Sequence, residues 1–332
     1  MKVAILYDGG SESWTAADVA GVLDNIRQVQ RSLRRLGHQG VRVPVTPLDL
    51  RWIRRVQRAD LVFNLLEGID GQAACEDWAV GALELTGVPF TGCRAGAITL
   101  CHRKHVANTL LAHEGIPVPR FALGCEGAVP TGLRYPVIVK PSGEDASVGI
   151  DGDAVCRSAA ALRDRLARMG AQFAELMVQE YVAGREFNVG FVGQTALPLS
   201  EISFARMPRG HWPIVSYAAK WAEGSPEYAG TEPVCPAAVD PVLAERILAV
   251  ARSAWQLLGR GEGYGRVDLR VAPDGTPWVL EVNPNPDLSE DAGLARMARA
   301  NGWDYDRLVD EVLREARART PAMSRPRAVS TA

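Results

Sequence analysis

The sequence lacks a long apolar run, a CxxC pair and a large excess of one charge. No stretch approaches the roughly 18 uninterrupted apolar residues of a membrane-spanning helix, and the apolar part of the amino-terminal MKVAILYDGG is too short for a signal peptide. A net charge of −2 and a pI near 6.3 give no electrostatic reason to expect nucleic-acid or anionic-membrane binding. The six cysteines are scattered, so we expect free thiols in a cytoplasmic protein that binds neither nucleic acid nor membrane.

Common catalytic motifs are also absent. There is no GxxxxGK[ST] phosphate loop and no GxSxG nucleophile motif. The segment GRGEGYG (259–265) imitates a dinucleotide fingerprint, but it precedes a strand instead of following one, so we expect a turn there. His102 and His105 lie beside Cys101 in LCHRKH, which is compatible either with a metal site or, as we favour, with an ordinary helix surface.

The 332 residues suit two or three packed units rather than one core. A β-α-β alternation over the first ~95 residues predicts a parallel sheet of the α/β class. The pattern from 96 to 185 is α+β, and the pattern from 186 to 317 is rich in strands. We therefore predict units at 1–95, 96–185 and 186–317, a long irregular loop at 206–235 that closes over a site, and a disordered tail at 318–332.

Residues 266–283, RVDLRVAPDGTPWVLEVN, predict a hairpin with a two-residue turn at Asp274-Gly275. With that turn, Asp268 lies opposite Glu281 and Arg266 lies opposite Asn283. All four side chains then share one face, because alternate strand residues point the same way. The other face is predicted to carry the apolar side chains of Val267, Leu269, Leu280 and Val282.

Opposed carboxylates, with Cβ atoms ~5 Å apart, repel each other and destabilise a sheet. A divalent cation bound between the two carboxylates would attract both and make the same arrangement favourable. Asp268, Glu281 and Asn283 offer the hard oxygen ligands that Mg²⁺ (or Mn²⁺) prefers, so we predict a metal site there. The alternative is an exposed polar face whose charge is balanced by Arg266 and Arg270.

Two other stretches suggest a nucleotide-binding site. In VIVKPSGEDASVGI, Lys140 ends an apolar strand beside small residues whose backbone N–H groups suit phosphates. In VQEYVAGREF, a buried strand ends at Gly184 and then presents Glu186. Taken singly, each stretch also fits a plain hairpin or a strand that ends in a turn.

The order of these motifs resembles the ATP-grasp superfamily. A lysine before a small-residue loop is followed by E-x-V-x-G-x-E (180–186), then by R-x-D (266–268) and a distant E-x-N (281–283). The segments FNLLEG, ELTGVPFTG and GIPVP resemble its D-alanine–D-alanine ligase branch, and the likeness covers about residues 1–315. The resemblance implies a Rossmann-like parallel-sheet domain at 1–95, a central ATP-grasp subdomain at 96–185 and a carboxy-terminal subdomain with the metal site at 186–317. It also implies ATP between the last two, and a homodimer.

The resemblance assigns roles residue by residue. The ATP-binding residues would be Lys104, Lys140, Ser147, Gln179, Glu180, Val182, Glu186 and Lys220. Lys104 and Lys140 would bind the phosphates, and Lys220 would reach the γ-phosphate. Gln179, Glu180 and Val182 would border adenine, and Glu186 would bind the ribose hydroxyls. The metal ligands would be Asp268, Glu281 and Asn283, and Arg266 would act with Lys220 in catalysis by stabilising negative charge on a tetrahedral intermediate.

The implied reaction is ATP-dependent amide formation between amino acid or peptide-like substrates. A carboxylate attacks the γ-phosphate to give an acyl phosphate, and an amine then displaces phosphate. Such chemistry needs charge neutralisation instead of a Ser/His/Asp or Cys/His nucleophile, which agrees with the absence of those motifs.

The sequence departs from the D-alanine ligase pattern on the substrate side. Trp14, Ala146 and Trp221 stand where a glutamate, a serine and a tyrosine are usual, Glu67 replaces a histidine, and Asp287 replaces a glycine. We therefore predict a rebuilt pocket for a larger, flatter or cationic substrate, in a specialised peptide or antibiotic pathway. The alternatives are an ordinary D-alanine–D-alanine ligase of cell-wall synthesis and a non-catalytic nucleotide-binding protein, and ring-closing amidation also stays open.

Overall fold

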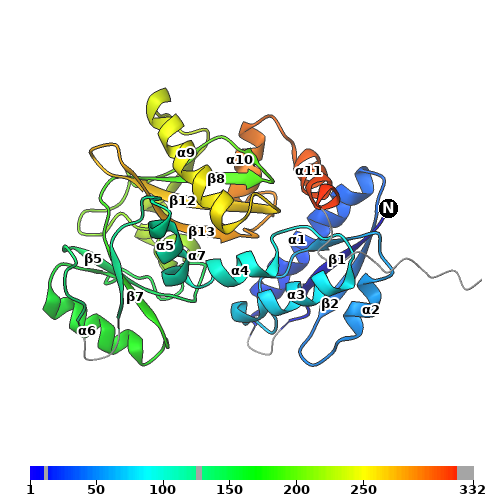
Figure 1. Cartoon of the computed structure of the whole chain (residues 1–332), viewed down its shortest axis with the longest axis horizontal. Helices are drawn as coiled ribbons and strands as arrows, with labels where there is room; N and C mark the ends of the chain where they lie inside the picture. The colour runs from blue at the N-terminus through cyan, green and yellow to red at the C-terminus, as the bar shows by residue number, and fades with distance from the viewer. Residues whose placement is uncertain (11–13, 125–128, 320–332) are drawn as a thin grey trace, which may run out of the picture.

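The computed structural model describes residues 1–10, 14–124 and 129–319 (Figure 1). Most of the predicted tail, 320–332, lies outside the described residues, and helix α11 (Tyr305–Ala318) extends to the start of it. Among the helices of the described ranges, none combines the length and apolarity needed to cross a bilayer.

The first unit is the predicted parallel sheet. Strands β1 (Lys2–Asp8), β2 (Gln39–Val45) and β3 (Leu61–Asn64) pair in the order β2-β1-β3. Its helices are α1 (Ala16–Arg35), α2 (Arg51–Val56) and α3 (Glu76–Thr86), the last preceded by the 3₁₀ turn η1 (Ala73–Cys75). The valine, isoleucine and leucine run of β1 is buried, as expected for a strand covered on both faces.

The second unit is an antiparallel sheet in the order β4-β7-β5-β6. Its strands are β4 (Phe121–Gly124), β5 (Val137–Pro141), β6 (Val155–Cys156) and β7 (Leu176–Glu180). Helix α6 (Ala159–Gly170) packs on one face through Leu162, Leu166 and Met169. Helices α4 (Ala95–Cys101) and α5 (Lys104–His113) connect this unit to the first (Figure 1).

The third unit is a larger sheet that contains the predicted hairpin. Its strands are β8 (Arg185–Val192), β9 (Thr195–Ala196), β10 (Ser200–Ser203), β11 (Glu232–Val234), β12 (Tyr264–Val271) and β13 (Pro277–Pro284). Helix α9 (Pro241–Leu258) packs against β12 and β13, and α10 (Gly293–Ala300) precedes α11. The three sheets fall almost wholly within the three predicted units, whose boundaries stay a prediction.

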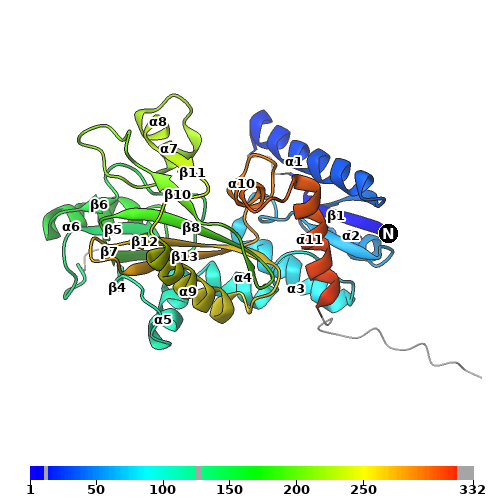
Figure 2. The same ribbon diagram turned by 90° about the horizontal axis from the view of Figure 1, so that it is seen from above.

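The predicted loop 206–235 is less irregular than expected. It contains the short helices α7 (Tyr217–Trp221) and α8 (Pro226–Gly230) and ends in β11, and Figure 2 shows it above β10 and β8. Ser216 and Ser225 cap the two helices by accepting hydrogen bonds from backbone N–H groups three residues later. These serine caps are the local signals that the prediction overlooked.

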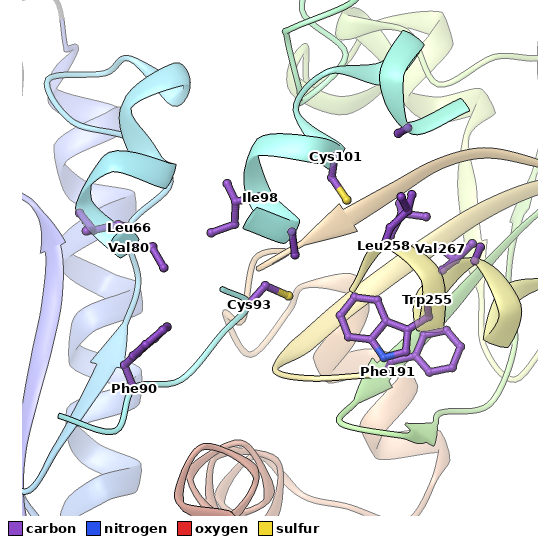
Figure 3. Packing of buried hydrophobic residues seen from close by; sticks show 14 of the residues in the cluster. Leu66, Val80, Phe90, Cys93, Ile98, Cys101, Phe191, Trp255, Leu258 and Val267 are labelled. Atoms are coloured by element: carbon purple, nitrogen blue, oxygen red, sulfur yellow. The ribbon is translucent and has the colours of Figure 1, made fainter. Parts of the chain in front are cut away.

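One apolar core joins the first and third units (Figure 3). Leu66, Val80 and Phe90 contribute from one side, and Trp255 and Phe191 from the other. The Trp255 and Phe191 rings stack with centroids 5.6 Å apart, and the indole N–H donates to the Gly193 carbonyl at 2.8 Å. A Cβ at position 265 would lie 2.2 Å from the Trp255 ring, so Gly265 is required on β12 beside it. The shared core fixes the sheet that carries the hairpin relative to the first unit.

The predicted pairing across the hairpin is confirmed for the four polar residues of the predicted metal site. Asp268 lies opposite Glu281, and Arg266 lies opposite Asn283. The turn itself was predicted wrongly, because Val271 pairs with Pro277 and five residues separate them. The Gly275 N–H donates to the Ala272 carbonyl at 2.8 Å across a turn whose second residue is a proline, a position that proline favours.

A register shift beyond Asp268 compensates for the longer turn. Leu269 pairs with Val279, so Leu280 is an extra residue on β13. Val279 is buried in the place predicted for Leu280, which is only partly buried. The two deviations cancel by the time the strands reach Asp268, and the acid pair keeps its predicted register.

Asn285 ties the end of β13 to the first unit. Its Oδ1 accepts from the Cys93 N–H at 2.6 Å, and its Nδ2 donates to Glu76 Oε1 at 2.9 Å, with all three residues buried. Its backbone has φ +48°, and a Cβ on the neighbouring Gly92 would lie 2.5 Å from Oδ1.

Asn285→Gly removes both hydrogen bonds without adding strain, because glycine tolerates the positive φ. We expect the free energy of unfolding to fall by about 1–3 kcal/mol, since Glu76 loses a buried donor. The measurement is urea-induced unfolding. Asp70→Gly, at φ +56° and with no described side-chain hydrogen bond, is the matched control and should change stability by no more than about 0.5 kcal/mol. Equal effects of the two changes would contradict the role of Asn285.

Candidate active site

In the sheet of the second unit, β4-β7-β5-β6, one face packs on α6 and the other face points away from it. Ile138 pairs with Gln179 and Lys140 pairs with Met177, so these four residues share a face. The opposite face carries Val137, Val139 and Val178, which belong to the core under α6. Lys140 and Gln179 therefore lie side by side on the face that is free of the helix.

Lys140 is buried and has no carboxylate within 4 Å among the described residues. Burial lowers the pKa of Lys140 to about 8, although Glu281, Glu186 and Asp268 act in the opposite direction. Those three carboxylates belong to the carboxy-terminal sheet, so Lys140 faces the hairpin across the space between the two sheets. A buried cation with no close partner suits an anionic ligand.

Gln179 is 1% exposed, and its Nε2 has no hydrogen-bond partner among the described residues. An unpaired buried amide donor costs about 1–3 kcal/mol. A ligand acceptor would remove that cost, which agrees with the prediction that Gln179 borders the nucleotide.

Glu180 points to the other side of the sheet. It accepts from the Arg134 backbone N–H at 2.9 Å and from the Arg134 guanidinium at 3.0 Å. Only its backbone is left to border a nucleotide. The Val182 carbonyl accepts from Arg270 at 3.0 Å, and the Val182 N–H has no hydrogen bond among the described residues.

Asp268 and Glu281 lie opposite each other, as predicted, inside a cluster of donors. Arg266 binds both oxygens of Asp268 at 2.6 and 2.7 Å, and Asn188 donates to Asp268 at 2.7 Å. The Asn283 amide donates to Asp268 at 2.9 Å and to Glu281 at 3.3 Å. Arg266 therefore balances the charge of Asp268, and the two amides donate hydrogen bonds to the acids; of these partners the sequence analysis had named only Arg266 as a balancing charge.

These residues fit a hard divalent cation. Burial alone would raise the pKa of Glu281, but Lys104, Lys140 and Arg266 lower it to about 2, so the carboxylate is charged. The Asn283 amide presents its nitrogen, and turning it over presents an oxygen instead. The alternative of an exposed, balanced face is only partly right. Arg266 does pair with Asp268, but Asp268 is buried and Arg266 is only partly exposed, and Arg270 binds Glu186 instead.

Lys104 completes the cluster from α5. Its Nζ lies 2.8 Å from Asp145 and 3.9 Å from Glu281. His102 Nε2 lies 3.4 Å from both Asp145 and Glu76, and His105 contacts Ser142 and Glu175 at 2.8 and 3.0 Å. Across the described ranges, no group of three or more His, Cys, Asp or Glu side chains has metal-binding geometry, so LCHRKH supplies partners for carboxylates.

The small-residue loop and the loop 206–235 contact each other. Trp221 donates its indole N–H to the Ala146 carbonyl at 3.0 Å, and Ser147 donates to the Val215 carbonyl at 2.9 Å. Lys220 Nζ lies 5.3 Å from the Trp221 ring. The Lys220 side chain still contacts solvent. Partial removal from water, and then the positive charge of Arg266, lower the pKa of Lys220. Two of the departures from the ligase pattern, Ala146 and Trp221, thus form one contact.

The other predicted substrate residues lie at the edge of the first unit. Partial removal from water, and then the charges of Asp287 and Glu76, raise the pKa of Glu67 to about 7. The Glu67 side chain also contacts solvent, and solvent screening weakens this shift. Asp287 accepts from Ser289 and from Asn25, so part of its role is to shape the loop before α10. Trp14 is half-buried beside Gly10, and no described contact links it to Lys220 or Glu67.

Comparison with known proteins identifies the family. A family model described as the D-ala D-ala ligase C-terminus matches residues 123–314. The D-alanine–D-alanine ligase of Synechococcus sp. (strain JA-3-3Ab) is 31% identical over 98% of both chains. The chain belongs to the D-alanine–D-alanine ligase family. It is an ATP-dependent ligase that forms a C–N bond.

Other relatives agree with this ligase assignment. The D-alanine–D-alanine ligase of Anaeromyxobacter sp. (strain Fw109-5) is 31% identical and covers 94% of this chain and 96% of its own. A Bacillus anthracis D-alanine–D-alanine ligase structure with ATP has a TM-score of 0.74 at 20% identity, with 95% and 97% of the two chains covered. This structural likeness confirms the ATP-grasp fold predicted from the motif order.

The sequence missed several partners of the ligase's predicted site residues. Asn188, on β8 opposite Asp268, and Arg270, two residues beyond Asp268 on the same face, both hold carboxylates in the site. The D-x-R spacing was a usable signal for Arg270. Glu76 and Asn285 could not have been found, because their contacts join residues 209 positions apart.

His102 gives the ligase a pH-dependent contribution to stability. Burial alone would lower the pKa of His102, but Glu76 and Asp145 outweigh burial and raise it above its usual value. A raised folded-state pKa stabilises the fold below the unfolded-state value, and the contribution disappears as pH rises through the folded-state pKa. We expect His102→Gln to lower the free energy of unfolding at pH 6 and to have a smaller effect at pH 8.5. Urea-induced unfolding at both values measures it.

His113→Gln, at the exposed end of α5, is the control for this pH experiment and should show little pH-dependent difference from the wild type. A stability deficit of His102→Gln that stays constant from pH 6 to 8.5 would show that its charge is not involved.

Proposed function

We propose that this ligase joins two molecules of D-alanine, with Mg²⁺ or Mn²⁺ at the Asp268–Glu281 pair. Relatives of that name align over nearly the whole chain at about one-third identity. They favour an ordinary D-alanine–D-alanine ligase, which the sequence analysis gave as an alternative, over a ligase with a rebuilt substrate pocket. The observation that carries the proposal is the convergence of Lys104, Lys140 and the acid pair between two sheets.

The proposed roles follow the contacts. Asp268, Glu281 and Asn283 would hold the metal, which when bound supplies positive charge to the ATP phosphates. Lys104 and Lys140 would bind those phosphates together with backbone N–H groups near Ser147. Gln179 and the Val182 N–H would border adenine, and Glu186 would accept from the ribose hydroxyls.

The chemistry needs positioning and charge more than a protein nucleophile. The carboxylate of the first D-alanine attacks the γ-phosphorus, and the bond from that phosphorus to the bridging oxygen breaks to release ADP. The amine of the second D-alanine attacks the resulting acyl phosphate and releases phosphate. Lys220 would steady the transferring group, and Arg266 the tetrahedral anion. The loop 206–235, held against the small-residue loop by Trp221 and Ser147, would exclude water.

A second candidate is favoured by one observation. The contact of Trp221 with Ala146 stands where the family pattern has hydroxyl-bearing side chains, and Glu67 reaches solvent near Asp287 and Lys220. This arrangement favours a larger or cationic amino acid in one of the two substrate positions.

Glu281→Gln removes one charge from the proposed metal site while it keeps the shape of the side chain. We expect ADP release with ATP and D-alanine to require Mg²⁺, and Glu281→Gln to lower it by about tenfold or more at limiting Mg²⁺, because a carboxylate ligand is lost. Coupled-enzyme detection of ADP measures the rate. Glu114→Gln, on an exposed helix end, is the control. Tight ATP binding without ADP release would indicate the non-catalytic nucleotide-binding protein instead.

A panel of amino acids separates the two candidate pockets. We expect D-alanine with D-alanine to give the highest kcat/KM among D- and L-amino acids offered alone and in pairs, with the dipeptide identified by mass spectrometry. Preference for an aromatic or basic amino acid would favour the second candidate. A product with the mass of one substrate less water would indicate ring-closing amidation.

A further inference from the structure

Arg270 lies at the meeting point of three segments around the proposed nucleotide slot. It is 3% exposed and lies on β12, two residues beyond Asp268. The three segments are the end of β7 with its following turn, the start of β8, and the loop that leads to α7. Nothing in the proposed reaction uses Arg270 directly.

The first contact of Arg270 is with Glu186 at the start of β8. Both Nε and Nη2 donate to the same carboxylate oxygen, Oε2, at 2.9 Å. The other oxygen, Oε1, has no hydrogen bond among the described residues. Two donors on one oxygen fix the rotation of the carboxylate and leave the second oxygen available to a ligand.

The remaining contacts fix Arg270 itself. Nη1 donates to the Val182 carbonyl at 3.0 Å, and Nη2 donates to the Pro213 carbonyl. The guanidinium lies 5.0 Å from the Tyr181 ring and 5.5 Å from the Phe204 ring, at cation–π distance. Each of the three segments thus holds the guanidinium in place.

The same segments pack on one another. The Tyr181 and Trp212 rings meet edge to face with centroids 5.1 Å apart, and Ile214 packs in the same small core. The loop and the turn after β7 therefore form a wall, and Arg270 is the polar group that connects this wall to Glu186.

We propose that Arg270 is a positioning residue for the nucleotide: it holds Glu186 so that Oε1 faces the two ribose hydroxyls. This inference rests on the proposed function, because it takes Glu186 as the ribose acceptor. Four of the five N–H groups of Arg270 are used by Glu186, Val182 and Pro213, so we expect it to act through Glu186. A lysine in its place would keep the charge but could not bind one oxygen with two fixed N–H groups.

The test combines protein variants with ATP analogues that lack one ribose hydroxyl. kcat/KM is measured for ATP, 2′-deoxy-ATP and 3′-deoxy-ATP with the wild type, Arg270→Lys and Arg270→Met. We expect the wild type to prefer ATP over the deoxynucleotides by about tenfold or more, as a hydrogen bond to a charged group implies. In both variants the preference should fall to within about threefold, through a higher KM for ATP.

Loss of folding alone would give a different result. A variant that is merely destabilised loses activity equally with all three nucleotides, so its preference for the ribose hydroxyls stays at the wild-type value. That outcome overturns the proposal. Arg185→Lys is the matched control, since Arg185 pairs with Glu201 through two hydrogen bonds at the surface, one residue from Glu186. It should keep the wild-type preference.

Glu186→Ala, which removes both acceptor oxygens, separates this inference from the function on which it rests. If Glu186→Ala keeps the full preference for ribose hydroxyls, Glu186 is not the ribose acceptor and the placement of ATP is wrong. If Glu186→Ala loses the preference while both Arg270 variants keep it, the ATP site stands and the role of Arg270 is overturned. Loss of preference in all three variants supports it.

Discussion

The arrangement of the site depends on keeping a buried carboxylate, Asp268, and a partly buried one, Glu281, face to face. Asp268 and Glu281 occupy opposed positions on β12 and β13, where like charges repel. Arg266, Lys104 and the Asn188 and Asn283 amides surround them and offset that repulsion. Because each of these partners comes from a different position in the fold, the pair survives only if the sheet, α5 and the connection between them keep their places.

The shared apolar core explains how those places are kept. Trp255 and Phe191 belong to the carboxy-terminal sheet and its helix, yet they lie in one core with Leu66 and Val80 of the first unit. Asn285 adds hydrogen bonds across the same boundary, one residue beyond the end of β13. The first and third units of the ligase are therefore joined by one apolar core and by these hydrogen bonds. The central sheet, with Lys140 and Gln179, faces them across the site.

Local patterns predicted what depends on neighbours in sequence. Alternation along β12 and β13 was enough to place Asp268 opposite Glu281, even though the turn was longer than expected, because the extra Leu280 restored the register. The order of short motifs was enough to predict the ATP-grasp fold, and the family comparison confirmed it. Lys140 and Glu186 were singled out by the same motifs, and their roles stay predictions.

The sequence could not predict which partner satisfies each charge. Glu180 sits in the motif expected to border adenine, but strand alternation turns its carboxylate toward Arg134. Arg270 was considered only as a charge that balances the acid pair, whereas the structure gives it to Glu186. In both cases the choice between partners depends on the face that the neighbouring strand or loop presents.

The Arg266–Asp268 contact connects the charge of the site to its chemistry. Both oxygens of Asp268 are occupied by the Arg266 guanidinium and by two amides, so a cation at Asp268 has to compete with Arg266. Arg266 is partly buried, lies among the carboxylates of Asp268, Glu281 and Glu186, which raise its pKa, and lowers the pKa of Lys220. Under the proposed function, a metal that took the place of Arg266 at Asp268 would leave the guanidinium free to stabilise the negative charge of the tetrahedral anion. The group that balances Asp268 without a metal would then be the group that stabilises charge in the reaction.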